Sequence, residues 1–288
     1  MTNSWQEISI PHGALQLAAR IHGDAAAPPI IALHGWRDNA ATFELLAQQL
    51  PYARIIAVDL PGHGLSTPRT NEGHYYIWSY IADVVAVVDG LNLSSFSLLG
   101  HSMGGAVAIL FAALYPERVN NLILLDTAGP LATSAEEAPA QMLRSLQQRR
   151  KLKPDYHHHY PNFMAAVKAR ADKGLSMDAA NILGKRGILQ DESGYYWNLD
   201  PRLSMANLLS LTEEQAAAFI RKLACDTLLI TANEFWADKR DWLALRCAYF
   251  RQLETYELQG NHHQHLDGQV DAVAELVKRF LAAQATKA

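Results

Sequence analysis

An alternation of short apolar runs with longer helical patterns constrains the fold more than any other feature of this sequence. Four runs of strand length occur in the first half: Ile30–Leu33, Ile55–Val58, Phe96–Leu99 and Leu122–Leu125. Uninterrupted apolar runs are typical of parallel strands that are buried on both faces. Because helical patterns separate them, the sequence predicts an α/β fold with a doubly wound sheet and right-handed crossovers.

The segments between and after these runs fit the same pattern. Ile77–Leu91 carries one apolar stripe at helical spacing, and Met103–Tyr115 is apolar almost throughout, as in a helix packed deep against a sheet. Near the end of the chain, Thr227–Ile230 predicts another core strand and Thr255–Leu258 an outer one. The final helix, over Val270–Leu281, has one apolar face.

A long segment interrupts the alternation. Residues from about Pro130 to Leu223 contain Ala- and Glu-rich helical stretches but no run typical of a buried strand. We interpret this segment as a helical cap inserted between two strands, with an ordinary second domain as the alternative. The expected organisation is a core over residues 1–129, a cap over 130–223 and the rest of the core over 224–288.

Composition excludes several classes of protein. Apolar residues make up 49% of the 288 positions and charged residues 19%, which excludes a disordered chain. The formal net charge of −4 offers no basic surface for a nucleic acid. Two cysteines are too few for a disulfide framework, and neither a signal peptide nor an apolar run of spanning length is present. We therefore expect a cytoplasmic protein with no nucleic-acid partner and no membrane span.

The strongest chemical signal is the sequence Gly100-His-Ser102-Met-Gly104. It follows the strand Phe96–Leu99 and opens the helix at Met103, so it lies on a sharp strand-to-helix turn. Such a turn needs glycines on both sides of a nucleophile, because it packs close to neighbouring backbone. Free N–H groups and the positive end of the helix dipole lie beside the serine. The pattern predicts that Ser102 is a nucleophile.

A second turn, His34-Gly-Trp36, directly follows the strand Ile30–Leu33. A turn at the carboxyl end of a neighbouring strand can direct a backbone N–H at the same pocket. Hydrolases with a nucleophile on such a turn combine this N–H with the one after the nucleophile to form an oxyanion hole. The amides of Trp36 and Met103 are the candidates here.

The general base is sought among 12 histidines. The informative segment is the loop before the final helix, from Gln259 to Asp267, because a loop there can reach the nucleophile turn from the carboxyl edge of the sheet. His262 is the first choice, since it directly follows the Gly-Asn turn, and His263 is the next. We expect His265 to pack or to cap locally.

These motifs carry a resemblance to a known family. The chain resembles the α/β-hydrolase superfamily over nearly its whole length, and within it the serine hydrolase-like proteins, relatives of the carboxylesterases and the meta-cleavage-product hydrolases. The resemblance is carried by His34–Asn39, Val58–Gly64, Gly100–Gly104, Leu125–Leu131 and Gly260–Leu266. It implies the α/β-hydrolase fold, an eight-stranded, mostly parallel sheet flanked by helices with a helical cap inserted after the sixth strand.

The acid of the catalytic triad is where the chain departs from many relatives, which carry a Gly-x-x-Asp pattern after the seventh strand. Here Ala232 stands at the glycine position and Phe235 at the aspartate position. Two candidates remain: Asp126, at the end of the strand Leu122–Leu125, and Glu234, one residue short of the usual place. Both keep the chain order of nucleophile, acid and histidine.

The sequence thus favours a cofactor-independent serine hydrolase that acts on a small carboxylic ester through an acyl-enzyme. Hydrolysis of a lactone, or of a C–C bond in a diketone, is the alternative within enzymes, and a small-molecule receptor on a hydrolase scaffold is the alternative from another class. The run His157–His159 suggests a metal site, but consecutive histidines point in different directions and no carboxylate or cysteine cluster accompanies them. We expect no metal and no cofactor.

Overall fold

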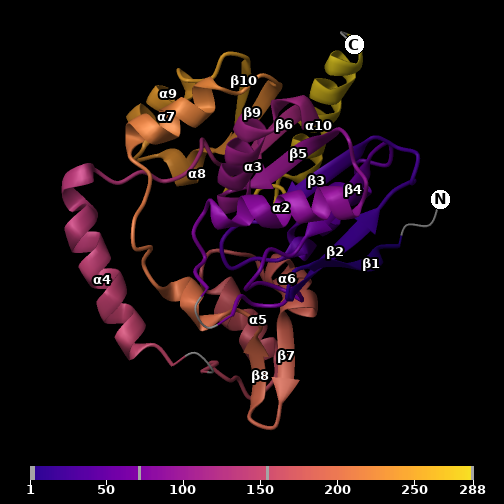
Figure 1. Cartoon of the computed structure of the whole chain (residues 1–288). Coiled ribbons are helices and arrows are strands. Elements are labelled where there is room, and N and C mark those ends of the chain that lie inside the picture. The colour runs from indigo at the N-terminus through magenta and orange to yellow at the C-terminus, as the bar shows by residue number, and fades with distance from the viewer. Residues whose placement is uncertain (1–3, 71–72, 154–155, 287–288) are drawn as a thin grey trace.

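The centre of the computed structural model, which describes residues 4–70, 73–153 and 156–286, is an eight-stranded sheet (Figure 1). The strands follow one another across the sheet in the order β1-β2-β4-β3-β5-β6-β9-β10. Their bounds are β1 Gln6–His12, β2 Leu15–His22, β3 Pro29–Leu33, β4 Arg54–Val58, β5 Phe96–His101, β6 Val119–Leu125, β9 Asp226–Ala232 and β10 Leu253–Leu258. Strand β2 pairs antiparallel with β1 and β4, and the other pairs are parallel. The predicted, mostly parallel sheet is confirmed.

The central strands are the apolar runs of the sequence. In β5 every residue is buried, and in β3 and β4 every residue after the first is buried. Helices cover both faces of this part of the sheet, so neither face can be polar. Strand β10 has only exposed and half-buried residues, as expected of an outer strand.

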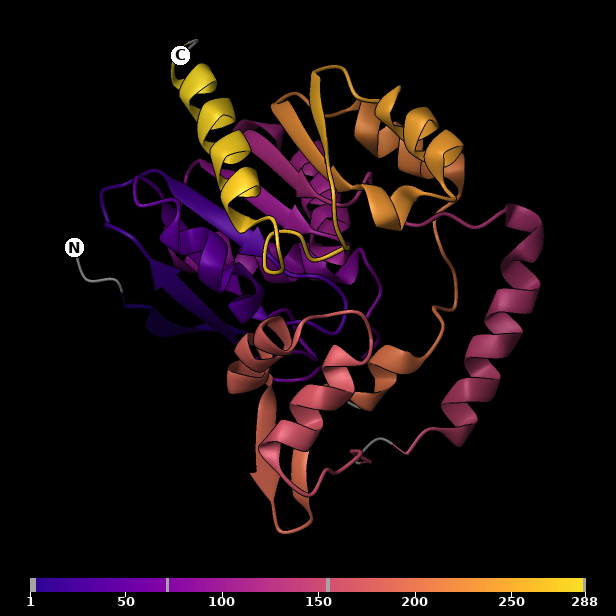
Figure 2. The ribbon, with the colours of Figure 1, turned by 180° about the vertical axis from the view of Figure 1, so that it is seen from behind.

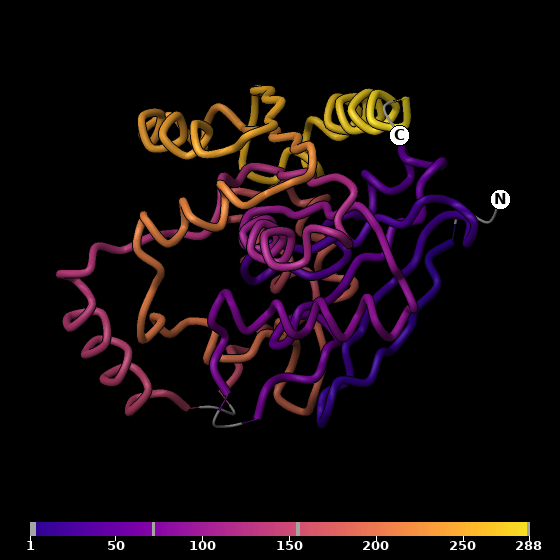
Figure 3. The backbone as a smooth tube through the Cα atoms, turned by 45° about the horizontal axis from the view of Figure 1, so that its top comes forward, coloured from indigo at the N-terminus to yellow at the C-terminus, as the bar shows by residue number. Residues whose placement is uncertain are grey.

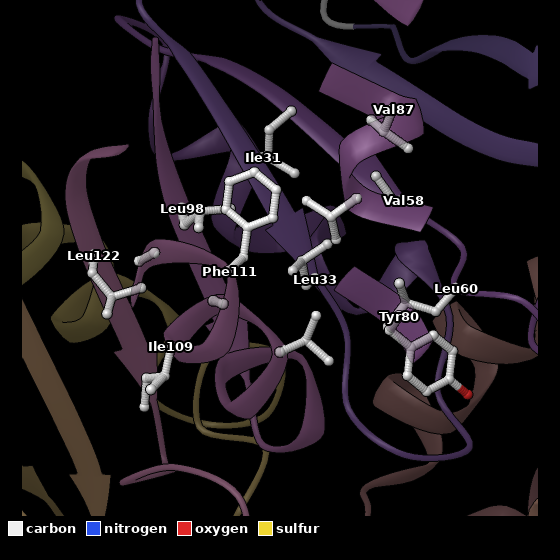
Figure 4. Packing of buried hydrophobic residues seen from close by; sticks show 14 of the residues in the cluster. Ile31, Leu33, Val58, Leu60, Tyr80, Val87, Leu98, Ile109, Phe111 and Leu122 are labelled. Atoms are coloured by element: carbon white, nitrogen blue, oxygen red, sulfur yellow. The ribbon is translucent and has the colours of Figure 1, made fainter. Parts of the chain in front are cut away.

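Neighbouring residues of one strand belong to two separate cores. Ile31 and Leu33 of β3 pack toward α2 (Ser79–Gly90) and α3 (Met103–Leu114), where Figure 4 shows Phe111 between Ile31, Leu33 and Leu98. Ile30 and Ala32 of β3 belong to the core on the opposite face, which also includes residues of α1 (Glu44–Gln48) and α10 (Val270–Ala285). Figure 2 shows α10 on that face. Alternation along the strand therefore produces a three-layered α/β arrangement.

The inserted segment, residues 130–223, follows β6. Its described residues form four α-helices and a hairpin: α4 Ala138–Lys151, α5 Phe163–Ala171, α6 Met177–Gly187, β7 Ile188–Asp191, β8 Gly194–Trp197 and α7 Glu213–Arg221. The hairpin was not predicted, because none of its residues is fully buried and its strands span only four residues each. Aromatic residues at 195–197 favour extended structure, and Gly194 has the positive φ of 127° that the turn requires.

Helix α6 of the inserted segment lies at the carboxyl ends of the parallel strands, whereas α7 packs against α3 in the core. Asn39 Nδ2, after β3, donates to the carbonyl of Leu183 in α6, 3.0 Å away. Arg186, also in α6, binds the buried carboxylate of Asp59 after β4. Helix α4 runs along the outside, apart from the sheet, in all three overall views (Figures 1–3). Ligands of open α/β sheets bind at this edge, so the site is sought beneath the inserted segment.

Two short elements complete the second half of the core, α8 (Asn233–Trp236) and α9 (Arg240–Cys247). They connect β9 to β10 and bring Trp236, which is almost fully buried, toward the end of β6. In the part of the chain that the structure describes, none of the helices has the length and apolarity needed to cross a membrane.

Candidate active site

Ser102 occupies the turn between β5 and α3 with φ 50° and ψ −116°, a backbone conformation that L-residues rarely adopt. The flanking glycines make this turn possible. A Cβ on Gly100 would lie 2.4 Å from the Cα of Gly105, and a Cβ on Gly104 would lie 2.0 Å from the carbonyl oxygen of Leu33. The strained turn is therefore held by close backbone packing, as is common at functional sites.

His262 and Asp126 meet across the end of the sheet. Nδ1 of His262, on the loop between β10 and α10, lies 2.5 Å from Oδ2 of Asp126, the residue after β6. The other carboxylate oxygen accepts hydrogen bonds from Ala232 N at 2.7 Å and from Trp236 Nε1 at 2.6 Å. With Nδ1–H donated to the carboxylate, Nε2 of His262 carries the free electron pair that a general base needs.

Two contacts bring Ser102 to this pair. The backbone N–H of Ser102 donates to the carbonyl of Leu125, the residue before Asp126. His101 is the residue before Ser102, and its Nε2 lies 2.9 Å from the carbonyl oxygen of His262. The imidazole rings of His101 and His262 have centroids 4.7 Å apart. Ser102, Asp126 and His262 therefore converge at one place on the carboxyl edge of the sheet.

Glu234 is not part of this group. It is exposed on α8, and its carboxylate forms no hydrogen bond or ion pair with the residues that the structure describes. The next residue, Phe235, contacts the histidine instead: its ring stacks on His262 with 4.1 Å between centroids. Phe235 stands where many relatives have their acid, and sequence reasoning did not assign it this packing role.

The turn after β3 packs against the nucleophile turn. The ring of His34 is buried, its Nδ1 donates to Gly35 O at 2.7 Å, and its Nε2 accepts the N–H of Leu60 at 3.0 Å. Because Gly104 touches the backbone of Leu33 and His34, the Trp36 loop and the start of α3 lie together. The first N–H groups of a helix have no acceptor within it, so the amide of Met103 is available for a ligand.

Three further histidines surround the candidate base, and each has its own role. His263 Nε2 donates to Asp38 Oδ2 at 2.9 Å, which makes His263 a poor candidate for the base. His265 is fully buried and bonds Thr42 Oγ1 at 2.8 Å, as expected of a packing residue. His101, whose ring lies between them, is the residue that sequence reasoning passed over, although it stands inside the Gly-x-Ser-x-Gly pattern.

Burial and charge fix the protonation of this cluster. Burial lowers the pKa of His101 and of His265 well below the ordinary value, and neighbouring histidines lower it further. Burial alone would raise the pKa of Asp38, but His263 and Arg170 lower it well below its usual range. His101 and His265 are therefore neutral at pH 7, and Asp38 is an anion.

Among the residues that the structure describes, one group of side chains has the spacing of metal ligands. Ligand atoms of Asp38, His101 and His263 all lie within 4.8 Å of one another. However, Arg170 Nη2 is 2.6 Å from the second oxygen of Asp38, and its positive charge disfavours another cation there. We assign no metal chemistry to this group.

The histidine run in the inserted segment does not converge. His157 packs on Tyr196 with 4.6 Å between ring centroids, and His158 packs on Tyr160. His159 Nε2 lies 2.9 Å from Asp191 Oδ2. The three rings therefore serve three different contacts.

A cavity of about 490 Å³ lies within the inserted segment, beside the core loop that carries Trp36. Its lining includes Arg37 from that loop, Arg170 from α5 and Trp197 from β8. Arg37 has φ 63°, and with Ser102 and Asp126 it is one of three non-glycine residues at this edge with a positive φ. Backbone strain is thus concentrated around the candidate active site.

Comparison with known proteins identifies similar hydrolases. The family model described as alpha/beta hydrolase fold matches residues 28–234. The chain is 32% identical to a probable serine hydrolase of Drosophila melanogaster over 97% of this chain and 88% of that protein. It is 30% identical to a serine hydrolase-like protein of Danio rerio over 99% of this chain and 90% of that protein. A crystal structure of a hypothetical protein from Pseudomonas aeruginosa PAO1 is similar with TM-score 0.91 and 36% identity, covering 96% of this chain and 98% of that one.

Proposed function

This chain belongs to the alpha/beta hydrolase fold family and is a hydrolase, and we propose that it cleaves a small carboxylic ester through an acyl-enzyme on Ser102. The observation that carries the proposal is the 2.5 Å hydrogen bond between His262 and Asp126, on a loop that also touches the residue before Ser102. This contact supports the roles that we propose for Ser102 as nucleophile, His262 as base and Asp126 as acid, which follow one another in the chain order common in this fold.

In the proposed reaction Ser102 Oγ attacks the ester carbonyl while Nε2 of His262 takes its proton. Asp126 holds the imidazole in the tautomer with Nδ1 protonated and stabilises the imidazolium. The C–O bond to the alcohol then breaks, and His262 returns the proton to the leaving oxygen. Water repeats the sequence on the acyl-enzyme and releases the carboxylic acid, so that ester and water yield acid and alcohol.

The developing oxyanion needs two donors. We assign this role to the backbone N–H groups of Trp36 and Met103, on the two turns that Gly104 allows to pack together. Removal of one such donor typically costs about a hundred- to a thousandfold in rate. Because backbone groups serve, the side chains at both positions are free to vary.

We further propose that the inserted segment acts as a cap over the substrate, and that Asp126 rather than Glu234 is the acid. Contacts from α5 and α6 to the loops after β3 and β4 support the cap.

We also propose that the enzyme is located in the cytoplasm. Cys225 and Cys247 are free, as is usual in a reducing compartment, and burial raises the pKa of the Cys225 thiol to about 11.

The test is covalent labelling together with turnover. A fluorophosphonate probe is expected to label the native chain, and short p-nitrophenyl esters are expected to be hydrolysed. Ser102→Ala should abolish both, whereas Ser193→Ala, an exposed serine in the β7–β8 turn, should change neither. Equal labelling of Ser102→Ala would remove the proposal.

Lactones and diketones tested in parallel decide between the enzymatic alternatives, because they use the same nucleophile but release different products. The receptor alternative predicts tight binding of a small molecule with turnover far below about 1–10³ s⁻¹.

A further inference from the structure

The cavity within the inserted segment has a basic lining. Its lining includes five cationic residues and one carboxylate: Arg37, Lys151, Lys153, Arg170, Lys173 and Asp200. The chain as a whole has a formal net charge of −4, so positive charge is concentrated at this place against the overall balance. A concave wall with one sign of charge raises the local concentration of ligands of the opposite sign.

The carboxylate in the lining does not neutralise these cations, because it has partners of its own. Arg202 Nε donates to Asp200 Oδ1 at 2.9 Å, and the hydroxyl of Tyr75 donates to Asp200 Oδ2 at 2.6 Å. Among the cations, Arg170 is paired with Asp38. The remaining four form no ion pair with any residue that the structure describes.

The walls also include aromatic rings. Tyr156 and Tyr160 approach from the segment after α4, and Trp197 stands at the end of β8. Trp197 is fixed by a hydrogen bond of 3.0 Å from its Nε1 to the carbonyl of Ala166. Such rings offer flat apolar surface beside the charges, which suits a ligand with an apolar body and an anionic end.

The cavity adjoins the candidate active site through two links. Arg37 directly follows Trp36, whose amide is a proposed oxyanion donor. Arg170 binds Asp38, which in turn accepts a hydrogen bond from His263, the neighbour of His262. The cavity therefore lies beside the loops that carry the proposed reacting groups, although none of those groups is part of its lining.

We propose that this cavity selects an ester that carries an anionic group, a phosphate or a carboxylate, away from the scissile bond. The proposal rests on the proposed function and specifies its substrate class. The neutral part of the substrate lies against the aromatic rings, and the anion lies among Arg37 and the three unpaired lysines.

Two matched pairs of esters test it and distinguish the two sources of charge. The first pair is 1-hexanoylglycerol and its 3-phosphate, in which the leaving alcohol gains a phosphate. The second pair is p-nitrophenyl hexanoate and the p-nitrophenyl monoester of adipate, in which the acyl group gains a carboxylate. We expect kcat/KM at low salt to be at least about tenfold higher for the anionic member of one pair, and this preference to shrink at high salt.

The variants are matched for charge. The triple variant Lys151→Gln, Lys153→Gln and Lys173→Gln should lower the ratio of anionic to neutral kcat/KM by about tenfold, mainly through KM. The triple variant Lys185→Gln, Lys222→Gln and Lys278→Gln removes the same net charge from exposed residues outside the cavity and should leave the ratio unchanged. Equal losses in both triple variants, or no preference in either pair, would overturn the proposal.

Failure of this inference is distinguishable from failure of the proposed function. If the neutral esters are hydrolysed by Ser102 without any preference for charge, the cavity proposal falls and the hydrolase mechanism stands. If no ester is hydrolysed, calorimetric binding of 1-hexanoylglycerol and its 3-phosphate to the native chain decides the cavity proposal alone. Tighter binding of the phosphate that the lysine variant loses supports it, and equal binding overturns it.

Discussion

Nδ1 of His262 and Oδ2 of Asp126 lie 2.5 Å apart although 136 positions separate the two residues in sequence. In our proposal the acid therefore stands after β6, not after β9. The segment after β9 supports it instead, since Ala232 N and Trp236 Nε1 both donate to its second oxygen. The buried Asp126 carboxylate thus accepts three hydrogen bonds. They compensate for the free energy that a charge loses when it is removed from water.

Replacement of Asp126 by Asn should abolish most activity and preserve the fold. The amide oxygen can still accept from Ala232 and Trp236, but the amide N–H₂ then donates to Nδ1 of His262. The imidazole proton moves to Nε2, which can no longer accept the proton of Ser102. We expect kcat for a p-nitrophenyl ester to fall by about 10⁴-fold, with the unfolding temperature little changed.

Glu234→Gln is the matched control for that variant. Its side chain is exposed and lies apart from the histidine, so the activity should change by no more than about twofold. A large loss in Glu234→Gln with an active Asp126→Asn would reassign the acid.

The sequence was sufficient for the elements that burial and periodicity define. The apolar runs became β3, β4, β5 and β6, and the Gly-x-Ser-x-Gly turn follows β5 as predicted. It did not decide the acid, because that choice depends on how the chain leaves β9. The short helix α8 begins at Asn233, exposes Glu234 and places Phe235 on His262. No local sequence pattern predicts where α8 begins or which of its side chains faces His262.

Gly104→Ala should disrupt the nucleophile turn. The added Cβ would lie 2.0 Å from Leu33 O, and backbone on both sides leaves it no room. We expect the free energy of unfolding in urea to fall by about 1–3 kcal/mol or more, and kcat to fall with it as the Trp36 and Met103 amides separate.

Gly13→Ala provides the comparison for that variant. Gly13 has φ 59° with no atom within 4 Å of an added Cβ, so only backbone strain of about 1 kcal/mol is added. Stability should fall slightly and activity should remain. Full activity in Gly104→Ala would show that the two turns are not closely coupled.

Asp38→Asn should destabilise the fold strongly, because it leaves the charge of Arg170 without its partner. The Asp38 side chain is 1% exposed and that of Arg170 is 19% exposed. Breaking a buried pair on one side costs about 3–5 kcal/mol. The double variant Asp38→Asn with Arg170→Gln should recover part of that loss in urea unfolding, since neither charge is then left alone. Simple addition of the two single losses would contradict the coupling.

The roles of the individual histidines also lay beyond sequence reasoning. The segment from 262 to 265 contains three of them, and the loop pattern alone ranked His262 first. Their partners come from other elements: Asp126 after β6, Asp38 after β3 and Thr42 in the 3₁₀ turn that follows. Only the fold assigns one partner to each ring.

Stability should fall in acid because buried histidines are neutral in the fold. Burial lowers the pKa of His63 to about 3, and it also lowers the pKa of His34, His101 and His265. The unfolded chain takes up these protons below about pH 6.5, so this stability is complete above that pH and is lost progressively as the pH falls toward 3. Each such histidine contributes a slope of about 1 kcal/mol per pH unit in that range.

Urea unfolding of the native chain and of His63→Phe at pH 7.5, 6, 5.5 and 5 measures this slope. Phenylalanine keeps a ring against His34 and Tyr80 but loses the hydrogen bond from Nδ1 to the carbonyl of Pro61. The variant should therefore be less stable by about 1 kcal/mol at pH 7.5, yet lose stability less steeply in acid, by about 1 kcal/mol per pH unit. If its slope equals that of the native chain, His63 is protonated in the fold as readily as in the unfolded chain, and burial does not control its charge.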